Sequence, residues 1–261
     1  MEPLKYKSKM KEVFVRAGIP VARGRVVEDL ESAEALIKKV GYPVVAKPDN
    51  GVGAAHTYRI NNKNELVDFF KTKPEMDYIM EEFIQGEIHS FNGLTDKEGR
   101  VIFLNSFIFS SGIMEVVNED LNIFYHSQKE IPMDLKEMGL RALKEFNLKE
   151  RFFHLEFFRT EDGRLIALEI NVRPPGGFSM DIFNYQNDAD LYKEYAKLVM
   201  NHETEIPGSP SYYCGYVGIK KHHLLRRLIR HMDIYWSIKA QLLLYSQGLL
   251  ETTPLSSGIR N

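Results

Sequence analysis

Three side chains with oxygen donors lie on two neighbouring segments that predict strands. Residues 152–159 and 164–173 are rich in Phe, Leu and Ile, and the turn at 160–163 between them is of the Asp-Gly kind, which predicts a β-hairpin. Glu169 and Asn171 are two residues apart and therefore share one face of the second strand, while Glu156 comes from the facing strand. Two carboxylates and an amide oxygen can converge there.

Carboxylates on apolar strands need a cation or a shared proton, because burying them unpaired is costly. Only hard oxygen donors are offered, so the cation that fits is Mg²⁺ or Mn²⁺. The residues alone leave a second interpretation open. In that interpretation Glu169 is a rim residue at a strand end, and Asn171 forms a turn before Pro174 and Pro175.

A lysine followed by a loop of small residues is the second chemical feature. Residues 43–48 predict a buried strand that contains Lys47, and the loop that follows contains Gly51 and Gly53. Glycines let backbone amides approach phosphate oxygens, and a lysine supplies a point charge for them. The spacing excludes a Walker A loop, which needs Gly-Lys-Ser/Thr at the start of a helix. A plain turn at residues 49–51 is the alternative.

The order of these features resembles a known family. Glu156, then Glu169 thirteen residues later, then Ile-Asn-Val-Arg at 170–173, is similar to the metal-binding end of the ATP-grasp superfamily. The resemblance is to the branch of carboxylate–amine or carboxylate–thiol ligases and biotin carboxylases. It covers residues 5 to 200 in order, and the α/β domain that ordinarily precedes the first lysine in this family has no counterpart in the sequence.

The resemblance implies an α+β fold of two lobes with nucleotide between them. Residues 1–84 would form the first lobe with its Gly-rich phosphate loop, and 85–210 the second lobe with the metal hairpin. Residues 211–261 have no match and form a basic tail, since from Gly215 onward seven Lys and Arg residues face two acidic ones. A basic amphipathic helix is predicted at 222–231, and residues 224–232 could dock a partner.

Site residues follow from the same resemblance, each at its matching position. Glu156, Glu169 and Asn171 would hold Mg²⁺, and Arg173 would reach the acyl phosphate or the substrate carboxylate. The resemblance also implies the residues that hold ATP. They are the first lysine, Lys7; the phosphate lysine Lys47 with Gly51 and Gly53; the adenine hinge of Glu81, Glu82, Phe83 and Ile84; the ribose carboxylate Glu87; and a further cation, Lys129.

The function implied is an ATP- and Mg²⁺-dependent ligase that activates a small-molecule carboxylate as an acyl phosphate for attack by an amine, a thiol or a similar nucleophile. Catalysis would come from positioning and from charge neutralisation by Lys47, Arg173 and the metals. One rival is an ATP-binding module without independent turnover, completed by a partner chain or a second copy that supplies the missing domain. Another is a structural or interaction domain with a basic tail.

Composition limits the remaining classes. A net charge of −2 argues against a general nucleic-acid binder. No membrane span or secretion signal is present, so the cytoplasm is the expected compartment. Cys214 is the single cysteine and is expected to be a small core residue.

The predicted elements are helices and strands in mixed order. Helices are expected from Ser8 to Gly18, from a cap at Ser32 to Gly41, after caps at Asn62 and Asp134, and over 188–200; further strands are expected at 25–27, 58–60, 77–84, 89–94 and 101–109.

Overall fold

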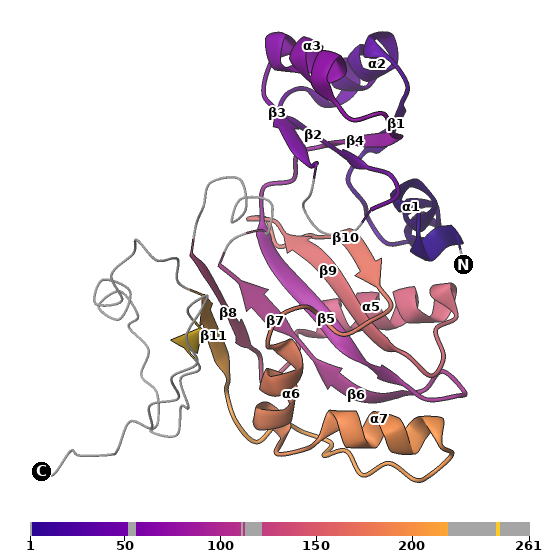
Figure 1. The fold of residues 1–261 in the computed structure, drawn as a ribbon, viewed down its shortest axis with the longest axis vertical. Coiled ribbons are helices and arrows are strands. Elements are labelled where there is room, and N and C mark those ends of the chain that lie inside the picture. The colour runs from indigo at the N-terminus through magenta and orange to yellow at the C-terminus, as the bar shows by residue number, and fades with distance from the viewer. Residues whose placement is uncertain (1, 52–55, 111, 113–121, 219–243, 246–261) are drawn as a thin grey trace, which may run out of the picture.

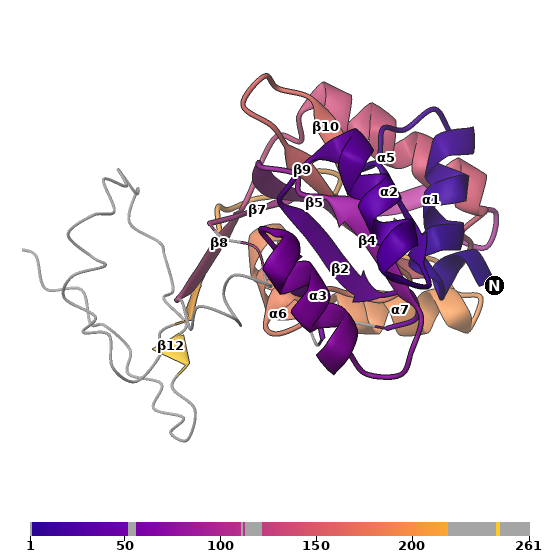
Figure 2. The same ribbon diagram turned by 90° about the horizontal axis from the view of Figure 1, so that it is seen from above.

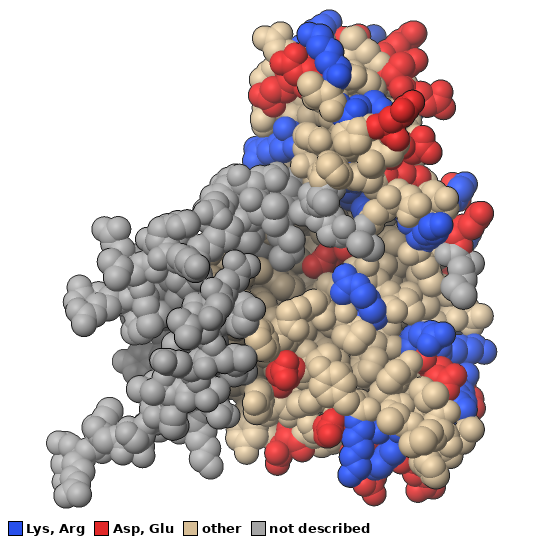
Figure 3. All heavy atoms as spheres, viewed as in Figure 1, with Lys and Arg blue, Asp and Glu red and all other residues tan. Residues whose placement is uncertain are grey.

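The computed structural model describes residues 2–51, 56–110, 112, 122–218 and 244–245. Figure 1 shows a smaller lobe built on one sheet above a larger lobe built on a second sheet. On the face drawn in Figure 3, acidic and basic side chains are interspersed over both lobes, without an extended patch of one sign. Within the described part of the chain, no helix has the length and apolar character that crossing a bilayer requires.

The smaller lobe is a four-stranded antiparallel sheet with two helices on one face (Figure 2). Its core is formed by Val44, Ala46, Leu66, Tyr78 and Met80. In spatial order the strands are β1 (Gly24–Val27), β4 (Tyr78–Glu82), β2 (Val44–Pro48) and β3 (Tyr58–Ile60), and the helices are α2 (Leu30–Val40) and α3 (Lys63–Thr72).

The prediction that Ser32 caps α2 is wrong by three positions. Asp29 is the N-cap, and its carboxylate accepts a hydrogen bond from the amide of Ser32 at 2.8 Å. Ser32 is the third residue of the capping box, because its hydroxyl accepts from the amide of Asp29 at 3.2 Å. Asn62 caps α3 as predicted.

The larger lobe is built on an eight-stranded sheet. In spatial order its strands are β10 (Leu165–Asn171), β9 (Phe152–Arg159), β5 (Glu87–Thr95), β7 (Phe107–Phe109), β8 (Ile123–Ser127), β11 (Gly215–Gly218) and β12 (Leu244–Tyr245), and β6 (Val101–Asn105) pairs with β5 off this path. The single strand predicted at 101–109 is therefore two strands. Both pair with the long strand β5, and the ladder is interrupted at Ser106, whose hydroxyl bonds to the side chain of Gln128 at 2.8 Å.

Helices cover both faces of this larger sheet (Figure 1). On one face, α5 (Met133–Phe146) packs with α1 (Lys7–Arg16), which follows the short 3-10 helix η1 (Glu2–Leu4). On the other face lie α6 (Ser179–Asn187) and α7 (Leu191–Val199), where one helix over 188–200 was predicted. Thus α1, which precedes the smaller lobe in the chain, contributes its apolar face to the core of the larger lobe.

Two further expectations need correction. Asp134 is not the cap of α5: Pro132 takes that position, and the carboxylate of Asp134 pairs with Arg159 at 2.7 Å instead. Residues 215–218 do not belong to a helical tail, because they form β11, which pairs antiparallel with β8. The helix predicted at 222–231 lies outside the described residues. Cys214 is only partly buried, and burial raises the pKa of its thiol to about 11.

Candidate active site

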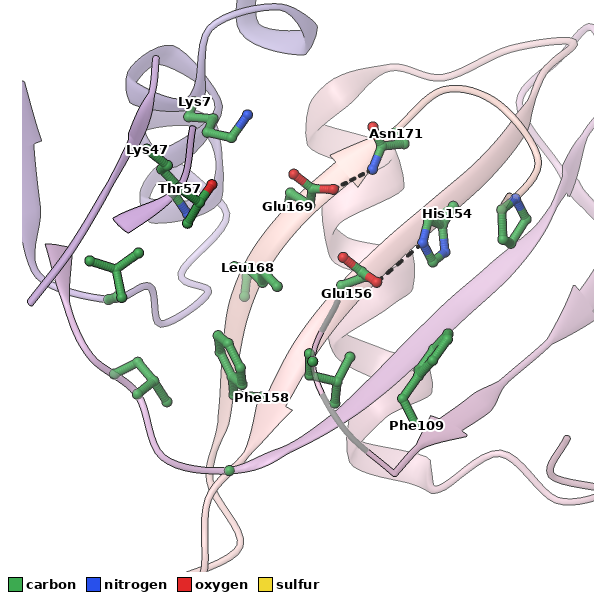
Figure 4. Close-up of a pocket in the computed structure, with 18 of the residues that line it drawn as sticks. Lys7, Lys47, Thr57, Phe109, His154, Glu156, Phe158, Leu168, Glu169 and Asn171 are labelled. Carbon is green, nitrogen blue, oxygen red and sulfur yellow. Dashed lines mark hydrogen bonds and ion pairs between the residues drawn. The ribbon is translucent and has the colours of Figure 1, made fainter. Parts of the chain in front are cut away.

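A cavity of about 570 Å³ lies between the two lobes. This volume is within the range of small-molecule and cofactor sites. Figure 4 shows Lys7 and Lys47 on one side of it and the strands that carry Glu156, Glu169 and Asn171 on the other. Lysine side chains therefore line one side of the cavity, and side chains with oxygen donors line the other.

Glu156 and Glu169 occupy directly opposite positions on β9 and β10. A β-bulge between Ala167 and Glu169 produces this arrangement, because it shifts the alternation of side chains by one residue. The consecutive residues Leu168 and Glu169 both line the cavity as a result, whereas Ile170 is buried in the core on the α1 and α5 side. The side-chain nitrogen Nδ2 of Asn171 donates a hydrogen bond to Glu169 Oε1 at 2.7 Å. The predicted convergence of Glu169 and Asn171 on one face is present.

A buried polar row supports Glu156 from the neighbouring strands. His154 Nε2 lies 3.4 Å from Glu156 Oε1, and His154 Nδ1 lies 2.6 Å from Asn92 Oδ1. The side-chain nitrogen Nδ2 of Asn92 in turn donates to Ser90 Oγ at 2.8 Å. This bond orients the side-chain oxygen of Asn92 towards His154. Burial opposes ionisation of Glu156, but His154, Arg173 and Lys47 outweigh it and hold the pKa of this carboxyl below its usual range.

This donor set fits a hard divalent cation. Glu156 and Glu169 supply carboxylate oxygens, and Asn171 Oδ1 remains available because only the amide nitrogen bonds to Glu169. Mg²⁺ usually takes one or two carboxylates and completes its shell with water and substrate phosphates. The described residues contain no group of three or more acidic, His or Cys side chains placed to hold a metal by themselves.

Lys47 and Lys11 share one buried counter-ion, Glu81, in the wall of the cavity. The ammonium of Lys47 lies 2.5 Å from Glu81 Oε2, and that of Lys11 lies 2.5 Å from Glu81 Oε1. Burial opposes ionisation of Glu81, but Lys47 and then Lys11 hold its pKa below the usual value. Burial also lowers the pKa of Lys11. Lys47 lines the cavity wall, whereas Lys11 does not.

Lys7 ties the first turn of α1 to the predicted phosphate loop. Its ammonium donates to the carbonyl of Gly51 at 2.6 Å. The carboxylate of Asp49 accepts from the amide and the hydroxyl of Ser8, each at 2.7 Å, and so closes the start of the same helix. Burial lowers the pKa of Lys7, although Glu169 opposes the shift. Gly51 is not part of the cavity wall, and Gly53 lies outside the described residues.

The predicted hinge residues Glu81, Glu82, Phe83 and Ile84 all line the cavity. Two of their amides are already used, because Glu82 donates to the carbonyl of Arg23 at 2.9 Å and Phe83 donates to that of Pro43 at 3.2 Å. The carboxylate of Glu82 pairs with the Arg23 guanidinium at 2.6 Å. Within the described residues, the backbone amide of Ile84 makes no hydrogen bond.

Besides Gly51, two further predicted nucleotide residues are not brought to the cavity wall. Glu87 bonds to His89 Nε2 at 2.7 Å and does not line the cavity. The ammonium of Lys129 lies 5.0 Å from the ring centre of Tyr213. The local pairing of each side chain keeps it away from the site.

The opposite end of the cavity carries Arg173 and the start of α6. Gly176, Gly177 and Ser179 line this end together with the stacked rings of Tyr125 and Tyr216, whose centres are 4.9 Å apart. Burial raises the pKa of Tyr125 to about 12, so its hydroxyl is neutral. Arg173 is exposed and donates one hydrogen bond to the carbonyl of Pro174 at 2.8 Å. Its remaining donors can meet an anionic substrate.

Sequence reasoning missed His154, Asn92 and Lys11. A signal existed for His154, because it lies two residues before Glu156 on an apolar strand and so shares its face. Ser90 and Asn92 show the same spacing on β5. Lys11 carried no such signal among the lysines at 5, 7 and 9, since its role depends on contact with Glu81, seventy residues away.

Comparison with known proteins agrees with this fold. Residues 40–182 match the family described as the ATP-grasp domain, which is more than half of the chain. The chain belongs to the ATP-grasp family, and the predicted α+β fold of two lobes is confirmed.

Similar curated proteins include two bacterial enzymes. The chain is 27% identical over 177 residues to the L-arginine-specific L-amino acid ligase of Bacillus subtilis, which covers 64% of the chain and 43% of that protein. It is 30% identical over 181 residues to the 2-oxoglutarate carboxylase small subunit of Hydrogenobacter thermophilus, with 64% and 38% covered. The chain therefore spans less than half the length of these relatives.

Similar solved structures show the same fold. The biotin carboxylase domain of the Hydrogenobacter thermophilus 2-oxoglutarate carboxylase, in complex with MgADP, has a TM-score of 0.67 at 24% identity, covering 82% of this chain and 50% of that one. An ADP complex of PurK, an N5-carboxyaminoimidazole ribonucleotide synthetase, has a TM-score of 0.70 at 17% identity, covering 88% and 60%.

Proposed function

We propose that this chain carries the nucleotide site of an ATP- and Mg²⁺-dependent ligase that activates a small-molecule carboxylate. The observation that supports the proposal best is the cavity between the lobes, where Lys7 and Lys47 face the oxygen donors of β9 and β10. A polyphosphate with its divalent cation matches both sides at once, since the lysines bind phosphate oxygens and the carboxylates bind the metal. An uncharged or purely apolar ligand would leave these groups unmatched.

In the proposed reaction a carboxylate oxygen of the substrate attacks the γ-phosphorus of ATP. The bond from that phosphorus to the β–γ bridging oxygen breaks, and ADP leaves. An amine, a thiol or a similar nucleophile then attacks the carbonyl carbon of the acyl phosphate and displaces inorganic phosphate. No protein nucleophile is required, so the protein contributes orientation and charge neutralisation.

Each side of the cavity has a role in this proposal. Glu156, Glu169 and Asn171 would hold Mg²⁺, which would supply charge neutralisation for the phosphates. Lys47 and Lys7 bind phosphate oxygens from the other side, and Arg173 binds the substrate carboxylate at the α6 end. Adenine is read by the hinge, where the Ile84 amide is the free donor.

The relatives support ligation but leave the substrate open. One named relative is a ligase of amino acids and another is a carboxylase subunit. Because the chain spans 43% and 38% of these two proteins, a second candidate is an ATP-binding module that a partner chain completes. Both candidates require Mg²⁺-dependent nucleotide binding, and only the first requires ligation by this chain.

Calorimetric titration of the purified chain with ATP and a non-hydrolysable analogue, with and without Mg²⁺, tests the proposal. Wild-type protein is expected to bind both nucleotides more tightly with Mg²⁺, and Glu169→Gln is expected to remove most of that Mg²⁺ dependence while preserving the fold. Glu161→Gln is the matched control, because Glu161 is exposed in the turn between the same two strands. Equal Mg²⁺ dependence in folded Glu169→Gln and in wild type would refute the metal assignment.

A further inference from the structure

Glu81 is a buried carboxylate between two buried ammonium groups. Its side chain is 6% exposed, and those of Lys47 and Lys11 are 9% and 14% exposed. Lys11 also donates to the carbonyl of Ala22 at 2.6 Å, which fixes its ammonium behind the cavity wall. The three groups therefore form a compact cluster of two positive charges and one negative charge.

The cluster has one positive charge in surplus, and that charge is on the cavity side. If Lys47 turns from Glu81 to a phosphate, Glu81 keeps Lys11 as its counter-ion. Without Lys11, the same movement would leave a buried carboxylate unpaired, which is strongly unfavourable. A neutral Lys47–Glu81 pair would also attract a polyphosphate less than the triad does.

We propose that Lys11 is a positioning residue that frees Lys47 from Glu81 for contact with nucleotide phosphates. This inference rests on the proposed nucleotide-binding function. Lys11 acts through Glu81 and does not touch the nucleotide. Lys11, which lies behind the cavity wall, thus sets the affinity of Lys47, which lies in that wall, for phosphate.

The charge count makes a reversal test possible. Lys11→Met changes the cluster from one surplus positive charge to none, and the double variant Lys11→Met with Glu81→Gln restores one. The matched control is Lys9→Met, since Lys9 lies on the same helix and is exposed, pairing only with Glu12 at 3.1 Å.

The quantity to measure by titration calorimetry is the ratio of the dissociation constants for adenosine and ADP, which isolates the phosphate contribution. We expect Lys11→Met to lower this ratio by about tenfold or more, which is the effect of one weakened charge-assisted contact. The double variant is expected to return the ratio to within about threefold of wild type, and Lys9→Met to leave it unchanged. Circular dichroism and thermal unfolding confirm that each variant is folded.

Several results would overturn the inference. One is an unchanged ratio of dissociation constants in Lys11→Met, whether both affinities are kept or adenosine and ADP binding are lost in parallel. Another is a low ratio that the double variant does not restore. A parallel loss or an unrestored ratio would make Lys11 merely structural. Should the double variant fail to fold, Lys11→Arg, which retains the charge, must keep the wild-type ratio. Wild-type protein that binds no nucleotide would instead refute the proposed function itself.

Discussion

The ammonium of Lys47 lies 2.5 Å from a buried carboxylate, so a nucleotide phosphate bound as proposed would have to compete with Glu81 for it. Charge-assisted hydrogen bonds are stronger than neutral ones, and those in a partly buried site are the strongest. The energetics of this cavity are therefore set by a few residues whose partners can be exchanged. Two predictions belong at this scale.

Lys47→Ala is expected to weaken ADP and ATP binding by about 1.5–3 kcal/mol, the range of hydrogen bonds to charged groups. Adenosine has no phosphate and is expected to bind almost unchanged. Titration of both ligands against wild type and variant measures the difference. Equal losses for ADP and adenosine would show that Lys47 holds the structure and not the phosphates.

Glu81→Gln is expected to lower the free energy of unfolding by about 3–5 kcal/mol at pH 7, because it leaves buried lysines without their counter-ion. The pKa of Glu81 in the folded chain lies below its unfolded value of about 4.3. The stabilisation is therefore complete above the unfolded pKa and is lost as the pH falls through the folded pKa.

Urea unfolding of wild type and Glu81→Gln between pH 7 and 3 checks this prediction. The difference between the two proteins is expected to be constant down to about pH 5 and to shrink below about pH 4. Glu12→Gln, which alters an exposed carboxylate paired with Lys9, serves as the control. A difference in unfolding free energy that grows on acidification would contradict a lowered pKa for Glu81.

At the scale of elements, the hairpin of β9 and β10 could be predicted from sequence because two runs rich in Phe, Leu and Ile and an Asp-Gly turn between them are local signals. The bulge at Leu168 could not be predicted, since it depends on how β10 pairs with β9. The division of 101–109 into β6 and β7 likewise depends on β5. The caps predicted at Ser32 and Asp134 were misplaced because each is a polar residue close to the start of a helix. A polar residue there can be assigned as the cap at more than one position.

The same contrast holds for the site. Glu156, Glu169 and Asn171 could be found because all three lie on one predicted hairpin. Glu87 and Lys129 were assigned from the family resemblance, and the structure pairs them with His89 and Tyr213 outside the cavity. The contact of Lys129 with Tyr213 joins distant positions of the chain, and no local periodicity reveals it.

Packing between α5 and β5 leads to a prediction at this scale. A Cβ atom added to Gly139 on α5 would lie 2.3 Å from the ring of Phe91 on β5, so Gly139→Ala is expected to destabilise the fold by about 1–3 kcal/mol through overpacking. Chemical unfolding measures the change. Gly208→Ala is the control, because an added Cβ there meets nothing within 4 Å and no positive φ is involved. Equal stability of the two variants would contradict the prediction.

At the scale of the whole molecule, α1 connects the two lobes. Its apolar face packs in the core of the larger lobe through Met10 and Phe14. Its polar face carries Lys7 and Lys11, one helical turn apart, whose ammonium groups contact Gly51 and Glu81 of the smaller lobe. α1 therefore contributes contacts that fix the relative position of the lobes at the cavity.

Phe14→Ala is expected to destabilise the chain by about 3–5 kcal/mol, since this side chain is 1% exposed and its ring packs edge-on against Phe146 at 5.2 Å. Val15→Ala on the opposite face, where Val15 is 60% exposed, is expected to change stability by less than about 0.5 kcal/mol. Thermal and urea unfolding of the two variants provide the comparison. A Phe14→Ala protein as stable as Val15→Ala would show that α1 is dispensable to the core.

The position of α1 also has a consequence for synthesis on the ribosome. The amide of Ile170 bonds to the sulfur of Met10 at 3.3 Å across 160 residues of sequence, so the helix that is translated early is packed late. The smaller lobe between them has mostly local partners and can fold as it emerges. A nascent chain that stops before β10 therefore lacks one of the elements that cover the apolar face of α1, although α5 and the partners of Lys7 and Lys11 in the smaller lobe have already been made.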